Sequence, residues 1–211
     1  MNARFQIEVD GQPREAEIRF GNDRDVHSLT RWRFQSEPGA NESIPDALEY
    51  ARLASKRWRH YRRTGATVTS LSELRDAIRR DPKSELAMIF TAHATWRSRT
   101  PILGFAYFRR SWCHHLTVDF LSAHPRVIDG KPERIRGVGT GILYQLVALA
   151  ETMDSPCIWG EATAHSAPFY ERALDVKKIL DHFFIEDEVL HYCRGELHKS
   201  RARMLARPST K

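Results

Sequence analysis

The sequence predicts a mixed α/β fold in which helices flank a sheet. Segments of alternating apolar and polar residues, which are typical of strands, are found in both halves of the chain. Other segments repeat apolar residues every three or four positions, as helices that pack on a sheet do. The stretch RIRGVGTGILYQLVALAE (134–151) places three glycines on alternate positions directly before such a helical pattern. A strand pattern follows it, so the order is that of an α/β unit.

The composition limits the class of protein. The chain has 211 residues, 41% of them hydrophobic, which suits one globular domain. No apolar run approaches the ~18 residues of a membrane span, and the N-terminus lacks the apolar core of a signal peptide, so we expect a cytoplasmic protein. The three cysteines lie far apart, which argues against a disulfide framework or a zinc ribbon. The net charge of +6 suggests an anionic partner: nucleic acid, an acidic protein or a ligand with several phosphates.

The first 83 residues predict a hairpin followed by helices. The segment FQIEVDGQPREAEIRF alternates on both sides of Asp10 and Gly11, and Pro13 indicates an edge position. Three helices are expected after it: one near 26–34, one that begins at Ser43 and has a single apolar face, and one that begins with a capping box at 70–73 and ends before Pro82.

The rest of the chain is richer in predicted strands. LAMIFTAHATW and ILGFAYFRR predict a hairpin around the turn RSRTP, and HHLTVDFLSAHP predicts a third strand that ends at Pro125. A polar loop (126–135) leads to the glycine stretch and its helix. We then expect a strand at PCIWGEAT, a short helix at HSAPFYERAL and a closing hairpin at DHFFIEDEVLHYCRGEL. With no linker in sight, 1–198 is predicted as one domain and 199–211 as a loosely ordered basic tail.

The three glycines fit one of three known phosphate-binding patterns. The dinucleotide pattern GxGxxG would need a glycine where the chain has Ile142, and the phosphate loop GxxxxGK[ST] would need a lysine after its last glycine. The pattern [Q/R]xxGx[G/A] fits in full, with Arg136, Gly139 and Gly141. Successive amides of such a turn and the dipole of the helix that follows both favour a diphosphate.

On this motif and its flanks, the chain resembles the GNAT superfamily of N-acetyltransferases. The resemblance extends from the strand VDFLSAHP through RGVGTG to IWGEAT and HSAPFYERAL, and the first 80 or so residues do not align by eye. It implies a mixed, twisted sheet with a V-shaped splay between two parallel strands, at VDFLSAHP and CIWGEAT. It also implies that 84–198 form an acetyl-CoA-binding core, with 1–83 supplying N-terminal strands and substrate-side helices.

The resemblance implies transfer of an acetyl group to a primary amine by direct attack in a ternary complex. The expected partners are a CoA thioester and a small-molecule or peptide amine. A strand backbone would bind the pantetheine arm and the oxyanion, and the glycine turn would bind the pyrophosphate. The corresponding cofactor-binding residues are Leu121, Ser122, Ala123, Arg136, Gly137, Val138, Gly139, Thr140 and Gly141.

Three residues are the catalytic candidates. Tyr170 matches the tyrosine of the family helix that follows the fifth strand, and a phenol with a pKa near 10 can donate a proton to the leaving thiolate. Glu161 matches a strand position where some members carry a catalytic glutamate. Asp119 lies two residues before Leu121, on the same face of a regular strand. Either carboxylate could act as the base, directly or through water, and many members use no single base. The histidines His115, His124 and His165 rank below them.

Several features leave alternatives open. Neighbouring residues of a strand point to opposite faces, so Cys113, His114 and His115 do not predict a metal site, and no metal is expected. The basic segment KRWRHYRR (56–63) fits a solvated helix end or a surface for an acidic partner. Two rival functions are a non-catalytic acyl-CoA-binding sensor of the same fold and, less favoured, a nucleic-acid-binding module. The loop 126–135 is longer than the family's, and the oligomeric state is open between monomer and homodimer.

Overall fold

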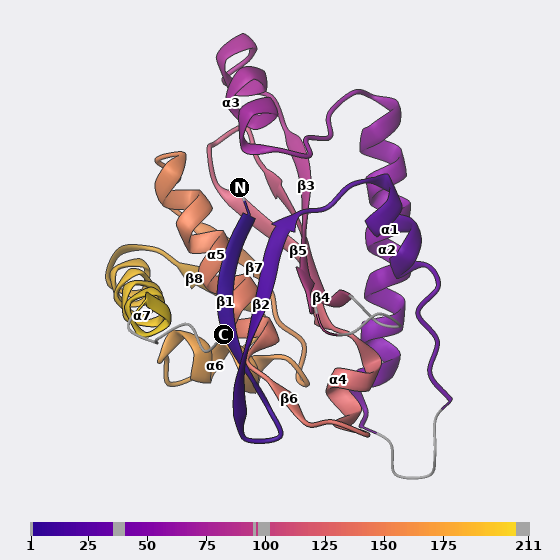
Figure 1. The fold of residues 1–211 in the computed structure, drawn as a ribbon. Coiled ribbons are helices and arrows are strands. Elements are labelled where there is room, and N and C mark those ends of the chain that lie inside the picture. Colours follow the sequence, from indigo (N-terminus) through magenta and orange to yellow (C-terminus); the bar gives the residue numbers. More distant parts are fainter. Residues whose placement is uncertain (1, 36–40, 95, 97–101, 206–211) are drawn as a thin grey trace.

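The computed structural model describes residues 2–35, 41–94, 96 and 102–205, which form a sheet between two layers of helices (Figure 1). The sheet has eight strands in the order β6-β1-β2-β3-β4-β5-β7-β8. The strands are β1 (Asn2–Val9), β2 (Gln12–Phe20), β3 (Leu86–His93), β4 (Ile102–Arg110), β5 (Leu116–Ala123), β6 (Ile135–Arg136), β7 (Ile158–Glu161) and β8 (His182–Ile185). The helices are α1 (Asp23–Leu29), α2 (Ser43–Arg63), α3 (Leu71–Arg80), α4 (Pro125–Asp129), α5 (Val138–Thr152), α6 (Ala167–Leu174) and α7 (Asp187–Leu205).

The strand pairing confirms the predicted mixed sheet. β1 and β2 form the expected hairpin, and β2, β3, β4 and β5 continue antiparallel from it. β5 and β7 pair in parallel, and β8 pairs antiparallel with β7. The two strands of the predicted β3–β4 hairpin pair as expected, while the turn at 97–101 lies outside the described residues.

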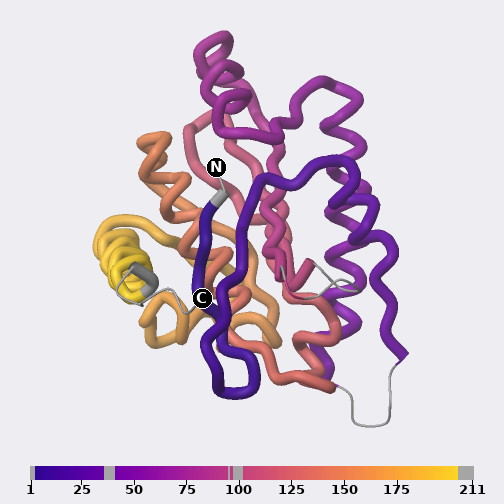
Figure 2. Tube along the Cα trace, viewed as in Figure 1, coloured from indigo at the N-terminus to yellow at the C-terminus, as the bar shows by residue number. Residues whose placement is uncertain are grey.

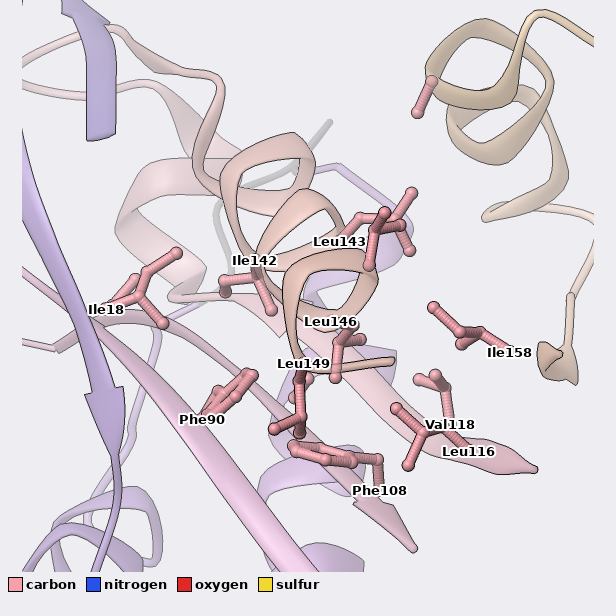
Figure 3. Close-up of a cluster of buried hydrophobic side chains, with 14 of the residues drawn as sticks. Ile18, Phe90, Phe108, Leu116, Val118, Ile142, Leu143, Leu146, Leu149 and Ile158 are labelled. Atoms are coloured by element: carbon pink, nitrogen blue, oxygen red, sulfur yellow. The ribbon is translucent and has the colours of Figure 1, made fainter. Parts of the chain in front are cut away.

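The larger part of the core lies between the sheet and α5. Leu146 and Leu149 of this helix project toward Phe108 and Val118 of the sheet (Figure 3). The predicted apolar stripe of α5 is therefore confirmed, and the helix is also buried on its flanks because α7 packs beside it (Figure 2). Burial of apolar surface at roughly 25 cal/mol per Å² makes this layer the main source of stability.

The other face of the sheet is covered by α1 and α2. Three alanines of α2 (Ala47, Ala51 and Ala54) are buried, so the helix can approach the sheet closely. Trp58 is buried among them, and its Nε1 donates a hydrogen bond to Asp23 at 2.7 Å. The single apolar face predicted for this helix is thus its contact with the sheet.

A β-bulge in β5 opens the sheet. Tyr107 pairs with Phe120 and Phe108 pairs with Val118, so Asp119 is the extra residue without a partner on β4. The parallel pairing with β7 ends at the same point, at Val118 and Gly160. Because a bulge bends its strand, the outer half of β5 turns away from β7, and the V-shaped splay is confirmed.

The bulge also corrects one inference from alternation. Asp119 contacts Arg57 of α2, whereas Leu121 packs against the core beneath α5. The two residues therefore lie on opposite faces of the sheet, since the extra residue shifts the alternation by one.

The predicted closing hairpin is wrong beyond β8. The chain turns at Asp187, which has a φ of 44°, and continues as the helix α7. Leu190, Cys193 and Leu197 are buried at intervals of three and four residues, which is the spacing of a helix face. The expected loose tail is also corrected for residues 199–205, which belong to α7, while 206–211 lie outside the described residues.

The segment 126–135 is more ordered than a polar loop. Pro125 begins the short helix α4, which ends at Gly130 with a φ of 73°. The chain then reaches β6, whose Ile135 and Arg136 pair with β1. The segment therefore fixes the approach to the glycine turn from the edge of the sheet.

Candidate active site

A cavity of about 740 Å³ lies where β5 and β7 diverge. Its walls come from the first turns of α2, the outer half of β5, α4, the glycine turn, the loop before α6, and α6 itself. All predicted cofactor-binding residues except Gly141 line it, and so does Tyr170. The residues that line it include Asp46, Tyr50, Leu121, Ser122, Ala123, Arg136, Gly137, Val138, Gly139, Thr140, His165, Phe169, Tyr170 and Arg172.

Each of the three positions in the turn favours glycine for a different physical reason. Gly137 caps α5 with a φ of 89°, a left-handed conformation that side chains rarely adopt. A Cβ on Gly139 would lie 3.0 Å from the ring of Phe169, inside the cavity wall. A Cβ on Gly141 would lie 2.2 Å from the ring of Phe5, and this glycine does not line the main cavity. Gly141 therefore allows α5 to pack on β1.

The N-terminus of α5 faces the cavity without a side-chain cap. The amide of Gly141 donates to the carbonyl of Gly137 at 2.9 Å and is used within the helix. The amides of Val138, Gly139 and Thr140 precede it and belong to the first turn, which lacks intrahelical acceptors. Such amides and the helix dipole favour an anion.

The outer half of β5 has one free edge. Leu121, Ser122 and Ala123 pair with β4 on one side, and the pairing with β7 has already ended at Val118. Their backbone therefore offers unpaired donors and acceptors to the cavity. An extended arm with amide groups, such as pantetheine, can add to such an edge as another strand does. The glycine cradle and this edge together fit a CoA thioester.

Tyr170 lines the cavity, and its side chain is buried. The ring stacks on Phe183 with 4.0 Å between centroids, and Phe169 packs against it edge-on. Burial raises the pKa of the phenol above its ordinary value, with a smaller contribution from Tyr50. Tyr170 thus keeps its proton at neutral pH, and no hydrogen bond within the described residues occupies its hydroxyl.

The two predicted carboxylates lie outside the cavity. Asp119 accepts hydrogen bonds from Arg109 at 2.6 and 2.9 Å and also pairs with Arg57, and its side chain is only 8% exposed. Glu161 is exposed at the end of β7. It is near enough to contribute to a raised pKa of Tyr50, although burial and Asp46 are the larger causes.

Another pair of residues lines the cavity instead. Nδ1 of His165 lies 3.2 Å from Oδ2 of Asp46, and its Nε2 lies 3.5 Å from Oε2 of Glu42. Asp46 and Tyr50 are one helical turn apart on α2, and His165 comes from the loop before α6. Asp46 is not among the site residues predicted from the sequence, and His165 ranked below the other catalytic candidates. The two residues are 119 positions apart, so the sequence carries no local signal of their proximity.

The basic segment 56–63 is partly engaged within the protein. Arg57 pairs with Asp119, and Arg62 lies 3.4 Å from Asp23. Arg57 therefore helps to attach α2 to β5, whereas the pair between Arg62 and Asp23 is exposed and weak. Among the described residues, no group of three or more His, Cys, Asp and Glu side chains is arranged to hold a metal ion. None of the described helices is long and apolar enough to cross a bilayer.

No protein-family model matches the sequence, and no curated protein matches it either. Among solved structures, an acetyltransferase of the GNAT family from Staphylococcus aureus is similar with 10% identity, 80% of this chain and 97% of that chain covered, and a TM-score of 0.48. A cAMP-binding acyltransferase from Mycobacterium smegmatis is 13% identical, with 98% and 57% covered and a TM-score of 0.41. A candidate streptothricin acetyltransferase from Bacillus anthracis, solved with acetyl coenzyme A, is 17% identical, with 48% and 63% covered and a TM-score of 0.37.

This chain thus spans less than two thirds of the last two proteins. At these identities the similarity concerns the fold alone. The mixed sheet and the splay between β5 and β7 are features of this chain itself, and they are those of the GNAT fold that the sequence resemblance implied.

Proposed function

We propose that this protein is an acetyl-CoA-dependent N-acetyltransferase that acts on a primary amine by direct attack in a ternary complex. The observation that carries the proposal is that the free edge of β5, the uncapped start of α5 and Tyr170 all line the same cavity. Acetyl-CoA would supply the acetyl group and a thiolate leaving group. The amides of Val138, Gly139 and Thr140, together with Arg136, would hold its diphosphate.

The edge of β5 would orient the pantetheine arm, and one of its N–H groups would face the acetyl carbonyl oxygen. A fixed donor at that position stabilises the negative charge that develops during acyl transfer. Tyr170 holds a proton at its hydroxyl and would deliver it to the departing sulfur. Its raised pKa suits a donor that must remain protonated until the sulfur leaves.

The amine would enter from the side of α2. The carboxylates of Asp46 and Glu42 make this rim anionic, which favours an alkylammonium ion. That ion must lose a proton before it can attack. We assign the proton transfer to His165, because its imidazole lines the cavity and lies within hydrogen-bond distance of Asp46. Glu161 is the alternative base, acting through water from the mouth of the cavity.

The test is thiol release from acetyl-CoA in the presence of polyamines, aminoglycosides, amino acids and peptides. We expect at least one amine to release CoA thiol well above the rate without amine. The thermal stability of the protein is measured in parallel with acetyl-CoA, because a ligand of the folded state raises the melting temperature. Stabilisation without release from any amine would favour the non-catalytic acyl-CoA sensor, and no stabilisation would contradict the site itself.

A further inference from the structure

A second cavity of about 290 Å³ lies on the other side of the glycine turn. It is enclosed by β1, the first turns of α5 and the last turns of α7. Figure 2 shows α7 (yellow) beside β1 and α5. Gly137, Thr140 and Tyr144 line both this cavity and the main one. The two cavities therefore adjoin at the N-terminus of α5.

The charges around the second cavity are predominantly positive. Arg4 comes from β1, and Arg201 and Arg203 come from α7. Glu196 is the one acid among its lining residues, and Lys199 pairs with it at 2.7 Å. Arg4 lies 3.4 Å from Glu15, but both side chains are largely exposed, and such surface pairs are weak. The cavity thus has the charge of a site for a phosphate group.

We propose that this second cavity binds the 3′-phosphate of coenzyme A. The inference rests on the proposed function, which puts the diphosphate of the same molecule on the amides of Val138 to Thr140. The 3′-phosphate is attached to the ribose next to that diphosphate, so it lies within reach of the adjoining cavity. Arg136 and Arg172 line the main cavity and suit the diphosphate. The arginines of β1 and α7 remain for the phosphate monoester, which arginine binds through paired hydrogen bonds.

The helix α7 is what makes this site. A closing hairpin, which the sequence pattern suggested, would carry the chain along the edge of the sheet beside β8. The helix instead packs against α5 and β1. This places Arg201 and Arg203 beside the glycine turn, although they follow its last glycine by 60 and 62 positions in the sequence.

The experiment compares the affinities of CoA and 3′-dephospho-CoA by isothermal titration calorimetry. We expect the protein to bind CoA roughly tenfold or more tightly than 3′-dephospho-CoA, the effect of a charge-assisted phosphate contact. The double variant Arg201→Gln/Arg203→Gln should lose this preference by binding CoA more weakly, with the affinity for 3′-dephospho-CoA unchanged. Arg194→Gln is the matched control, because Arg194 is on the same helix, near Glu151, and lines neither cavity. It should keep the preference.

Each other outcome contradicts the proposal in a distinguishable way. Equal affinities of the unmodified protein for the two ligands would overturn the 3′-phosphate site and leave the proposed function intact. A preference that survives in the double variant would overturn the assignment to Arg201 and Arg203. Binding of neither ligand would overturn the proposed function as well. Arginine-dependent stabilisation by inorganic phosphate, without a preference for CoA, would make the cavity a site for free phosphate. Circular dichroism checks that the variants retain their helices.

Discussion

At the scale of single residues, Tyr170 is a buried side chain that lines the cavity. Tyr170→Phe keeps the stacking on Phe183 and removes only the proton that the side chain can give. We expect unchanged stability and unchanged acetyl-CoA binding, with turnover lower by about 10²–10⁴-fold, the usual range for a general acid. Thiol release and the acetyl-CoA-induced shift in melting temperature measure the two effects. Full turnover in the variant would leave Tyr170 a packing residue.

The base is tested by comparing His165 with Glu161. His165→Gln should reduce turnover by about 10²–10⁴-fold at neutral pH and recover part of it at high pH, where free amine is abundant. Asp46→Asn should have a smaller effect of the same kind, because Asp46 orients the imidazole. Glu161→Gln is expected to change little. pH profiles of kcat/KM for the three variants decide the matter, and the opposite ranking would transfer the role to Glu161.

Asp119 is predicted to stabilise the fold and to take no part in proton transfer. Its carboxylate is held by Arg109 and Arg57, which joins the bulge of β5 to α2. Asp119→Asn leaves two guanidinium groups without their counter-charge, so the melting temperature should fall clearly. The pH profile of the remaining activity should match that of the unmodified protein. A shifted pH profile with an unchanged melting temperature would contradict this structural role.

At the scale of elements, two glycines of the turn are predicted to have different roles: Gly139 serves ligand binding, and Gly141 serves the packing of α5 on β1. Gly139→Ala puts a methyl group into the cavity wall beside Phe169, so acetyl-CoA should stabilise this variant much less while its own melting temperature changes little. Gly141→Ala forces Phe5 to move, and overpacking of this kind costs about 1–3 kcal/mol. It should lower the melting temperature and leave the ligand-induced shift largely in place. Thermal unfolding with and without acetyl-CoA measures both. If the two variants showed the same melting temperature and the same acetyl-CoA-induced shift, the two glycines would not have these separate roles.

At the scale of the whole molecule, the buried His93 links stability to pH. Burial and the nearby Arg19 lower its pKa to about 4, although Asp25 acts in the opposite direction. The unfolded chain has the ordinary pKa near 6.5, so it binds a proton between pH 6.5 and 4 that the folded protein does not. The free energy of unfolding should therefore decrease as the pH is lowered from 6.5 to 4, by at most about 1.4 kcal/mol per pH unit.

Urea unfolding at several pH values measures this dependence. His93→Gln should flatten the curve between pH 6.5 and 4, whereas His27→Gln, which changes an exposed histidine of α1, should not. If both variants keep the slope of the unmodified protein, other groups are responsible for it.

Local sequence patterns determined most of the helices and strands, and they marked the glycine turn before α5. Alternation defined the β1–β2 hairpin, and the apolar repeats defined α2 and α5. The glycine turn predicted a diphosphate site at the N-terminus of α5, and this stays a prediction. These features depend on neighbours within a few residues, which the sequence displays directly. The family resemblance added Leu121 and Tyr170, and both line the cavity.

Contacts between distant segments decided the rest. The bulge at Asp119 has no mark in the sequence, because it arises from the register between β4 and β5, and it moved that carboxylate to the far face of the sheet. Asp46 and His165 meet only when α2 packs across the splay. The segment after β8 became a helix because α5 and β1 offered an apolar surface to residues such as Leu190 and Cys193. Burial on a surface made by remote residues outweighs local strand propensity, and only the tertiary structure supplies that surface.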